Sequence, residues 1–165
     1  MANRHKSLVA FVVLVVGTGW LIGATNLPGQ WYAGLSKPSF NPPNWIFAPT
    51  WTVLYVMIAA AGWRTYLRER PTAVPMLLWY AQVALNFVWS PVVFTLHNLA
   101  LGLAIIYTLL AVFVGFIWVQ ASNDRVAAIL FFPYAAWVAF ASVLNYFLYR
   151  LNSGSYGART SEKDT

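Results

Sequence analysis

Five long apolar segments dominate the sequence and limit the folds that this chain can adopt. Crossing the hydrocarbon core of a bilayer takes about 20 mostly apolar residues in a helix. The qualifying segments are residues 8–27, 45–67, 74–96, 99–121 and 126–151. Because lipid satisfies no backbone polar group, segments that are apolar on nearly all sides must be helical. The sequence therefore predicts an all-α fold, with one transmembrane domain over residues 1–151 built as a five-helix bundle.

The composition narrows the functions that such a bundle could serve. Charged residues make up 8% of the 165 residues, about a third of the roughly 25% found in soluble domains. The absence of cysteine excludes disulfides, zinc–thiolate sites and redox thiols. The net charge of +6 comes from basic residues at the termini and in short loops, where the positive-inside rule accounts for them. Nucleic acid is therefore not an expected partner.

Polar residues predict how the ends of the chain behave and how it crosses the membrane. Arg4 and Lys6 precede the first apolar segment as in a signal peptide. Apolar character continues past Gly17 without a small-residue cleavage site, which favours a retained span. The distribution of Lys and Arg favours an orientation with the N-terminus inside and the first loop outside. It leaves open whether the membrane is an inner, an outer or an organellar one. Residues 152–165 form a polar tail that we expect to be disordered.

The stretch from Trp31 to Trp51 differs from an ordinary loop in its stiffness and its aromatic content. Prolines at positions 38, 42, 43 and 49 remove backbone donors and prevent one continuous helix. The aromatic side chains of this stretch are Trp31, Tyr32, Phe40, Trp45, Phe47 and Trp51. One interpretation is a lid over a pocket for a flat ligand. The other is an anchor at the membrane boundary, where Trp and Tyr gather.

Polar and aromatic residues inside the predicted spans fall on single helix faces. An amide that points at lipid is costly, so Asn86 and Asn145 should face the bundle interior. The tryptophans of the same faces, Trp89 and Trp137, then turn inward as well. These faces predict either a pocket or ordinary hydrogen bonds and packing between helices. The stripes are Trp79, Gln82, Asn86 and Trp89 on the third segment, Tyr134, Trp137, Ala141 and Asn145 on the fifth, and Trp51 with Tyr55 on the second.

The fourth segment carries small residues on one face instead. They are Ala104, Thr108, Ala111 and Gly115. Small side chains let two helices approach closely. The sequence therefore predicts a close helix contact at this face, either inside the bundle or between two copies of the chain.

Groups for acid–base, metal or ion-coupled chemistry are missing from the predicted spans. All four acidic residues lie in loops or the tail, whereas proton-coupled carriers commonly hold an ionisable residue within the membrane. His5 and His97 lie outside the membrane centre and form no cluster, so no metal is expected. No nucleophile–base pair is visible in the sequence. Any chemistry would come from tryptophan, tyrosine or the ligand itself.

Three motifs carry a resemblance to a known family. They are WYAGLSKPSFNPPNWIFAPTWTVLY (Trp31 to Tyr55), ALNFVWSPVVF (Ala84 to Phe94) and PYAAWVAFASVLNYFLYRLN (Pro133 to Asn152). In this order and spacing the chain resembles the translocator protein family, whose members are called tryptophan-rich sensory proteins in bacteria and the peripheral benzodiazepine receptor in animals. The resemblance implies a five-helix bundle with the first loop folded over a central pocket, often as a homodimer.

The resemblance also implies a ligand class and a set of pocket residues. Family members bind porphyrins and benzodiazepine-site ligands, and animal members also bind cholesterol. Trp51 and Trp137 match tryptophans implicated in light-dependent breakdown of protoporphyrin, and would be the catalytic residues of an enzyme. With Tyr55 added because it stacks one turn from Trp51, the expected ligand-binding residues are Gly23, Ala24, Trp31, Tyr32, Phe47, Ala48, Trp51, Tyr55, Asn86, Trp89, Trp137 and Ala141.

Other positions bear on ligand preference. The sterol-recognition pattern of the fifth helix is present as Leu144, Tyr146 and Arg150, although a Tyr and an Arg near a helix end are also ordinary interface anchors. The chain departs from the family at two positions. Phe40 stands where many members have tryptophan, and Leu101 stands where animal members have a ligand-contacting tryptophan.

Three functions follow as expectations. The first is a receptor-like membrane protein that binds protoporphyrin IX or a related tetrapyrrole between its helices under the first loop, stacked on Trp51 and Trp137, with no further cofactor. Lys37 is the nearest basic residue in sequence for the propionates of such a ligand, or else a solvated loop lysine. The second is an enzyme that promotes light- and oxygen-dependent porphyrin degradation. The third is a carrier of porphyrin or lipid across the membrane.

Overall fold

The computed structural model describes residues 2–161 of the chain, with side chains described over residues 4–153. Within that range no strand is present, and five helical segments are long and apolar enough to cross a membrane. The predicted all-α bundle is therefore confirmed. The elements are α1 (Ala2–Thr25), α2 (Gln30–Ala33), the 3-10 turn η1 (Asn44–Ile46), α3 (Phe47–Tyr66), α4 (Val74–Ser90), the π-helical turn η2 (Pro91–Thr95), α5 (Leu99–Asn123) and α6 (Arg125–Ser161).

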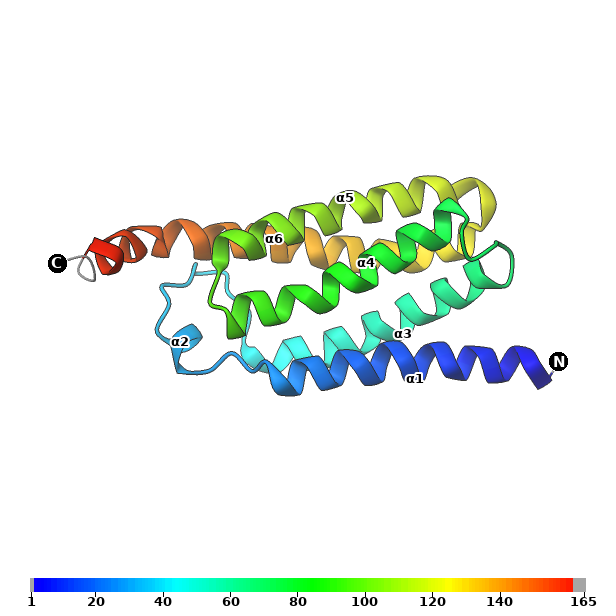
Figure 1. Cartoon of the computed structure of the whole chain (residues 1–165), viewed down its shortest axis with the longest axis horizontal. Coiled ribbons are helices and arrows are strands. Elements are labelled where there is room, and N and C mark those ends of the chain that lie inside the picture. Colours follow the sequence, from blue (N-terminus) through cyan, green and yellow to red (C-terminus); the bar gives the residue numbers. More distant parts are fainter. Residues whose placement is uncertain (1, 162–165) are drawn as a thin grey trace.

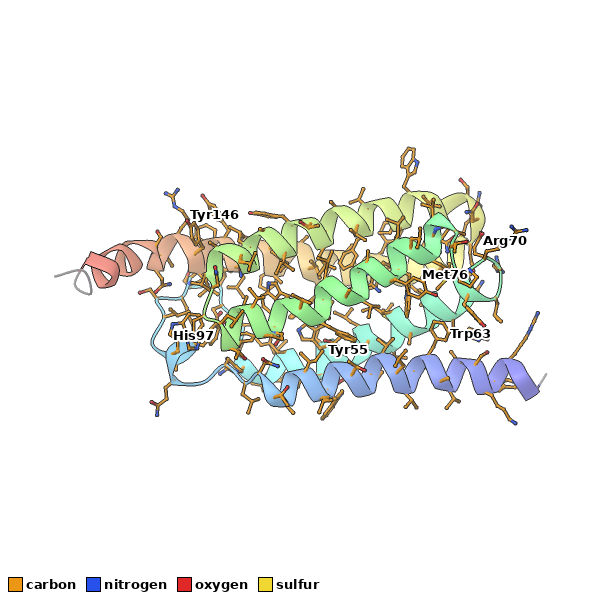
Figure 2. All side chains as sticks on the ribbon, in the orientation of Figure 1. Tyr55, Trp63, Arg70, Met76, His97 and Tyr146 are labelled. Atoms are coloured by element: carbon orange, nitrogen blue, oxygen red, sulfur yellow. The ribbon has the colours of Figure 1, made fainter. Side chains whose placement is uncertain are left out.

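The five long helices run side by side along the longest axis of the molecule (Figure 1). Helix α1 begins at one end of the bundle and α6 ends at the opposite end, as an odd number of spans requires (Figure 1). Helix α5 packs against α4 and α6, while α1 packs mainly against α3. We call the end that carries residues 26–46 the loop end, and the end that carries residues 64–73 and 123–125 the basic end. Figure 2 shows His97 at the loop end and Arg70 at the basic end.

Aromatic side chains fill the core between α5 and α6. The rings of Phe116 and Phe131 stack with centroids 4.1 Å apart, and the rings of Phe113 and Tyr134 lie 4.2 Å apart. All four side chains are fully buried. A stacked or tilted arrangement of rings adds about 1 kcal/mol per pair to the free energy gained from burial. This core fixes α6 against α5.

The small-residue stripe on α5 faces away from this core. Ala104, Thr108 and Ala111 are exposed, and Gly115 is half-buried with the side chain of Leu78 near it. The stripe is therefore not buried between helices of one chain along most of its length. Its use in a dimer stays a prediction.

The connection between α5 and α6 is a single residue, Asp124, which joins three helices at the basic end. Arg64 of α3 donates from Nε and Nη2 to the two carboxylate oxygens, at 3.0 and 2.9 Å. The backbone amide of Ala127 donates to the same carboxylate at 3.3 Å, which caps the first turn of α6. Arg64 thus turns inward to a buried partner.

Burial alone would raise the pKa of Asp124, because a carboxylate loses hydration in the protein interior. Hydrogen bonds from Arg64 and from the Ala127 amide, with the positive charges of Arg64 and Arg68, outweigh that effect. The pKa of Asp124 therefore lies below its ordinary value. The carboxylate is charged at neutral pH, and it ties α3 to the α5–α6 connection.

Helix α4 does not end as a regular α-helix. Pro91 has no amide hydrogen, and the backbone beyond it widens into the π-helical turn η2. The amide of Leu96 donates to the carbonyl of Pro91 at 2.9 Å. His97 follows with a φ of 54°, in the left-handed region that a non-glycine residue rarely adopts. This turn sends the chain directly into α5.

Helix α6 extends beyond the residue at which we expected the polar tail to begin. We expected disorder from Asn152, but α6 continues to Ser161. Asn152 is buried, and its Nδ2 donates to the carbonyl of Leu148 at 2.8 Å and to that of Ser36 at 3.0 Å. The tail therefore does not begin at Asn152, because that residue is held by the helix and by the first loop. Residues 162–165 lie outside the described residues.

Candidate functional site

A cavity of about 510 Å³ lies inside the loop end of the bundle. Small-molecule sites commonly measure about 300–1,000 Å³. The walls come from the second half of α1, the first half of α3, the end of α4 with η2, the first half of α5 and the middle of α6. Tyr32 of α2 and Phe47 at the start of α3 close the cavity near the loop. The cavity is thus assembled from all five spans and the first loop.

Most of the residues predicted to bind a ligand line this one cavity. Tryptophan and tyrosine side chains from α3, α4 and α6 form its broad apolar walls, while the small residues lie on α1, α3 and α6. The structure brings residues together that lie more than one hundred positions apart in the sequence. That they bind a ligand stays a prediction. The residues that line the cavity as expected are Gly23, Ala24, Tyr32, Phe47, Ala48, Trp51, Tyr55, Asn86, Trp89, Trp137 and Ala141.

Trp31 is the exception, because it does not line the cavity. Its indole stacks on the imidazole of His97, with ring centroids 4.2 Å apart and an interplanar angle of 19°. Successive residues of a helix point about 100° apart, so the single turn of α2 cannot direct both Trp31 and Tyr32 inward. Tyr32 is buried against Phe94, and Trp31 instead joins α2 to the connection between η2 and α5.

A chain of hydrogen bonds crosses the inner wall of the cavity. The hydroxyl of Tyr55 donates to Oδ1 of Asn86 at 3.2 Å, and Nδ2 of Asn86 donates to the hydroxyl of Tyr134 at 2.7 Å. These contacts link α3, α4 and α6. Figure 2 shows Tyr55 near the middle of the bundle's length. Asn86 therefore faces the interior, as its position on a polar helix face predicted.

Three other polar side chains at the cavity have buried atoms with no hydrogen-bond partner among the described residues. They are the indole nitrogens of Trp89 and Trp137 and the amide of Asn145. Buried polar groups in folded proteins are nearly always hydrogen-bonded, so such groups at a cavity wall are candidates for ligand contacts. The side chain of Gln82 is also buried without a partner in the described part of the chain, but it does not line the cavity.

The first loop is fastened over the cavity by side chains at its centre. The amide of Ser36 donates to Oδ1 of Asn152 at 3.0 Å, and Nδ2 of Asn152 donates back to the carbonyl of Ser36. Nζ of Lys37 donates to the carbonyls of Tyr32, Ala33 and Leu35 at 2.7, 3.1 and 3.4 Å. Lys37 therefore caps α2 and is not a solvated loop lysine. Burial raises the pKa of Tyr32, whose ring lies 4.8 Å from the Lys37 ammonium.

The three residues of the sterol-recognition pattern do not form one site. Leu144 is buried and lines the cavity. Tyr146 and Arg150 are exposed on the outer side of α6, where the Arg150 guanidinium lies 6.0 Å from the Tyr146 ring centroid. The pair has the geometry of an interface anchor.

Some cavity residues were not predicted from the sequence. Val93 and Phe94 reach the wall because the π-helical turn rotates the residues after Pro91, so the proline was the available signal. Asn26 lies at the wall, and its Oδ1 accepts a hydrogen bond from the hydroxyl of Thr95, which ties the end of α1 to η2. Gly19 and Trp20 had no signal in a single sequence.

The fold and the cavity define an integral membrane protein of five helices with an internal aromatic pocket under its first loop. The chain belongs to the TspO/MBR family, whose sequence pattern matches residues 8–150. The resemblance that the three motifs indicated is therefore confirmed.

Similar proteins come from bacteria and animals. Protein CrtK of Rhodobacter capsulatus is 38% identical over 156 residues, which cover 90% of this chain and 96% of that protein. The translocator protein of Homo sapiens is 36% identical over 160 residues, which cover 88% of this chain and 90% of that protein. The tryptophan-rich sensory protein of Cereibacter sphaeroides is 35% identical over 150 residues, covering 91% and 94%. The likeness extends over nearly the whole length of each chain.

Proposed function

We propose that this protein binds protoporphyrin IX or a related tetrapyrrole in the cavity under the first loop. The observation that carries the proposal is the convergence of Trp51, Trp89 and Trp137 from three different helices on one cavity of about 510 Å³. Broad aromatic walls suit a flat apolar ring system, because stacking adds to the free energy of burial. The unpartnered indole nitrogens of Trp89 and Trp137 would donate to acceptor atoms of the ligand.

A second candidate function is light-dependent degradation of the bound porphyrin. Trp51 lies between two tyrosines, with ring centroids 5.4 Å from Tyr55 and 6.1 Å from Tyr134. Light-excited porphyrin would take one electron from Trp51 or Trp137 and pass it to oxygen, which gives superoxide. The oxidised tryptophan would then recover an electron from the porphyrin, directly or through a neighbouring tyrosine. The porphyrin is thus the net electron donor and oxygen the oxidant, and the porphyrin radical cation combines with superoxide to give an oxygenated product. The contact between Trp51 and the two tyrosines is the observation that favours this candidate.

One titration tests both functions. Protoporphyrin IX is added to the purified protein in darkness and then under illumination, while tryptophan quenching and the porphyrin absorption band are followed. Saturable quenching in the dark supports binding, and its absence would remove the tetrapyrrole proposal. Sterols and benzodiazepine-site ligands, added as competitors, show whether they share the cavity.

Two double variants separate binding from degradation. Trp51→Phe with Trp137→Phe should slow light-dependent loss of the band at equal porphyrin occupancy, because both proposed electron donors are removed. The matched control is Trp45→Phe with Trp118→Phe, since these tryptophans are 73% and 81% exposed and do not line the cavity. The same rate of loss in both double variants and in the unsubstituted protein would exclude the enzyme.

A further inference from the structure

The cavity has one open side. The lining residues that are exposed all lie on α1, on the chain that follows it, on η1 or at the start of α3. The lining residues of α4, η2, α5 and α6 are buried or half-buried, among those whose side chains are described. The exposed ones are Trp20, Gly23, Ala24, Leu27, Pro28, Asn44 and Ala48. The opening therefore runs along the loop-end part of the seam between α1 and α3 and continues past Leu27, Pro28 and Asn44 of the first loop.

The seam is tight towards the basic end and loose towards the loop end. At the basic end, Nε1 of Trp63 donates to Oγ of Ser7 at 2.9 Å. Midway along, Gly19 is buried directly against the Tyr55 ring, so closely that a Cβ at position 19 would overlap it. Beyond that contact, Gly23 has no atom within 4 Å of the place its Cβ would occupy. Open space therefore adjoins α1 at Gly23, one turn beyond the contact of Gly19 with Tyr55.

The residues on the two sides of this gap are too small to close it. Gly23 and Ala24 on α1, and Ala48 on α3, present at most a methyl group. Trp20 is 59% exposed at the border of the gap, and Leu27 is 70% exposed. Gly23, Ala24 and Ala48 lie within the segments apolar enough to span a membrane. The gap therefore lies in the last turn of one apolar span and the first turns of the next, near the loop-end limit of both.

The middle of the first loop, in contrast, is held to the rest of the bundle by contacts from several elements. Asn152 of α6 exchanges two hydrogen bonds with the backbone of Ser36, and Trp31 stacks on His97. Phe40 meets the ring of Phe147 on α6 at 5.5 Å between centroids. Opening the cavity through the loop would break all of these contacts. Passage through the seam would break none of them.

We propose that the ligand reaches the cavity sideways from the membrane, through the window between α1 and α3, and not through the first loop. The window is formed by Gly23, Ala24 and Ala48 and is bordered by Trp20. It admits a flat, membrane-dissolved molecule, whose edge passes between the small residues. This inference rests on the proposed function, since protoporphyrin IX is the ligand used to test it.

Two reversible cross-links test the route, because the chain contains no cysteine that could compete. The window lock is Gly23→Cys with Ala48→Cys. The lid lock is Ser36→Cys with Asn152→Cys, placed where the loop already touches α6. Each pair is joined by a bis-methanethiosulfonate reagent in protein reconstituted into vesicles, and reductant reopens it. Binding of protoporphyrin IX is followed in darkness by tryptophan quenching, with the lock closed before or after the porphyrin is added.

The route is read from a comparison of porphyrin binding when the cross-link is closed before and after the porphyrin is added. We expect the window lock to abolish loading when closed first and to retain the porphyrin when closed afterwards, with both effects reversed by reduction. The lid lock should leave loading and release unchanged. Normal loading through a closed window lock, or a block by the lid lock, would overturn the proposal. Failure of the unsubstituted protein to bind porphyrin would instead overturn the proposed function.

Discussion

Gly62 shows how one residue sets the distance between two helices. The indole of Trp79 on α4 occupies the place where a side chain at position 62 of α3 would begin. With its ring in that place, Trp79 donates from Nε1 to the carbonyl of Ile58 at 2.9 Å. Trp79 is only 3% exposed. Glycine is therefore required here by the close approach of an aromatic ring and not by backbone conformation.

We predict that Gly62→Ala lowers the free energy of unfolding by about 1–3 kcal/mol, the usual cost of overpacking a core. The added methyl must displace the Trp79 ring and lengthen its hydrogen bond. Gly17→Ala is the matched control, because nothing lies within 4 Å of a Cβ at that position of α1. It should be neutral or stabilise by up to about 1 kcal/mol. Thermal unfolding in detergent that shows equal losses for both variants would contradict the prediction.

The sequence predicted the direction of a side chain correctly where exposing that side chain to lipid would be costly. Asn86 and Asn145 are buried, as an amide in a membrane span requires. Trp31 was placed wrongly in the cavity, because a motif does not tell which of two neighbouring aromatics in a single helical turn points inward. The close contacts at Gly19 and Gly62 could not be predicted either, since glycine is common in membrane helices.

The helix connections at the basic end depend on one carboxylate. Asp124 is 4% exposed and accepts two hydrogen bonds from Arg64. Nε of Arg68 lies 3.4 Å from the Asp124 carboxylate, but the Arg68 side chain is 51% exposed. Because solvent screens an exposed charge, this second ion pair adds little to the stability of the fold. Asp124 thus serves as a cap for α6, a connection between α5 and α6, and an ion-pair partner for α3.

Asp124→Asn should lower the free energy of unfolding by about 2 kcal/mol at neutral pH, since a charged hydrogen-bond acceptor is lost. Because the folded-state pKa is depressed, the stabilisation is complete above the ordinary pKa of 3.8 and is lost as the pH falls through the lower folded value. The difference between the two proteins should therefore be constant from neutral to weakly acidic pH and shrink below about pH 4.

Glu69→Gln is the control for this prediction, because it removes a carboxylate at the same end of the bundle that forms no ion pair among the described residues. Its effect on stability should be small at every pH. Denaturation curves recorded in detergent across the pH range measure both variants. A loss for Glu69→Gln as large as that for Asp124→Asn would mean that general charge, and not this contact, is responsible.

Whole elements were predicted from apolar length, because a span needs a minimum number of apolar residues to cross the bilayer. The four connections between spans also fell between the predicted apolar segments. The π-helical turn after Pro91 and the continuation of α6 past Asn152 were not foreseen. Both depend on hydrogen bonds that exist only in the folded molecule: the Leu96 amide to the Pro91 carbonyl, and Asn152 to the first loop.

At the scale of the whole molecule, the first loop and α6 act as one unit through Asn152. Asn152→Ala removes both hydrogen bonds to Ser36, so the loop should open more often and its backbone amides should exchange faster with deuterium. Ser153→Ala is the control, because the Ser153 hydroxyl donates only to the carbonyl of Arg150 within the same helix. Unchanged exchange at residues 35–37 in Asn152→Ala would show that the other loop contacts suffice.

The assembled cavity was less predictable than its parts. Aromatic helix faces left a pocket and ordinary packing equally open, and only the resemblance to a family placed residues of α1, α3, α4 and α6 at one site. The reason is geometric, since the wall residues come from helices whose relative rotation a single sequence does not encode. The open space beside Gly23 was not predicted at all, because it depends on how α1 lies against α3 beyond the contact of Gly19 with Tyr55.

If a ligand fills the cavity through its open side, as proposed, that route also determines which ligand concentration sets the occupancy of the cavity. A pocket filled from water responds to the molarity of its ligand, whereas a pocket filled through the α1–α3 seam responds to the mole fraction of ligand dissolved in the lipid. An apolar ring system accumulates in that phase according to its partition coefficient, through the same transfer free energy that buries apolar surface in a protein. Occupancy would therefore follow the lipid composition and lipid abundance of the cell as closely as it follows the supply of the ligand.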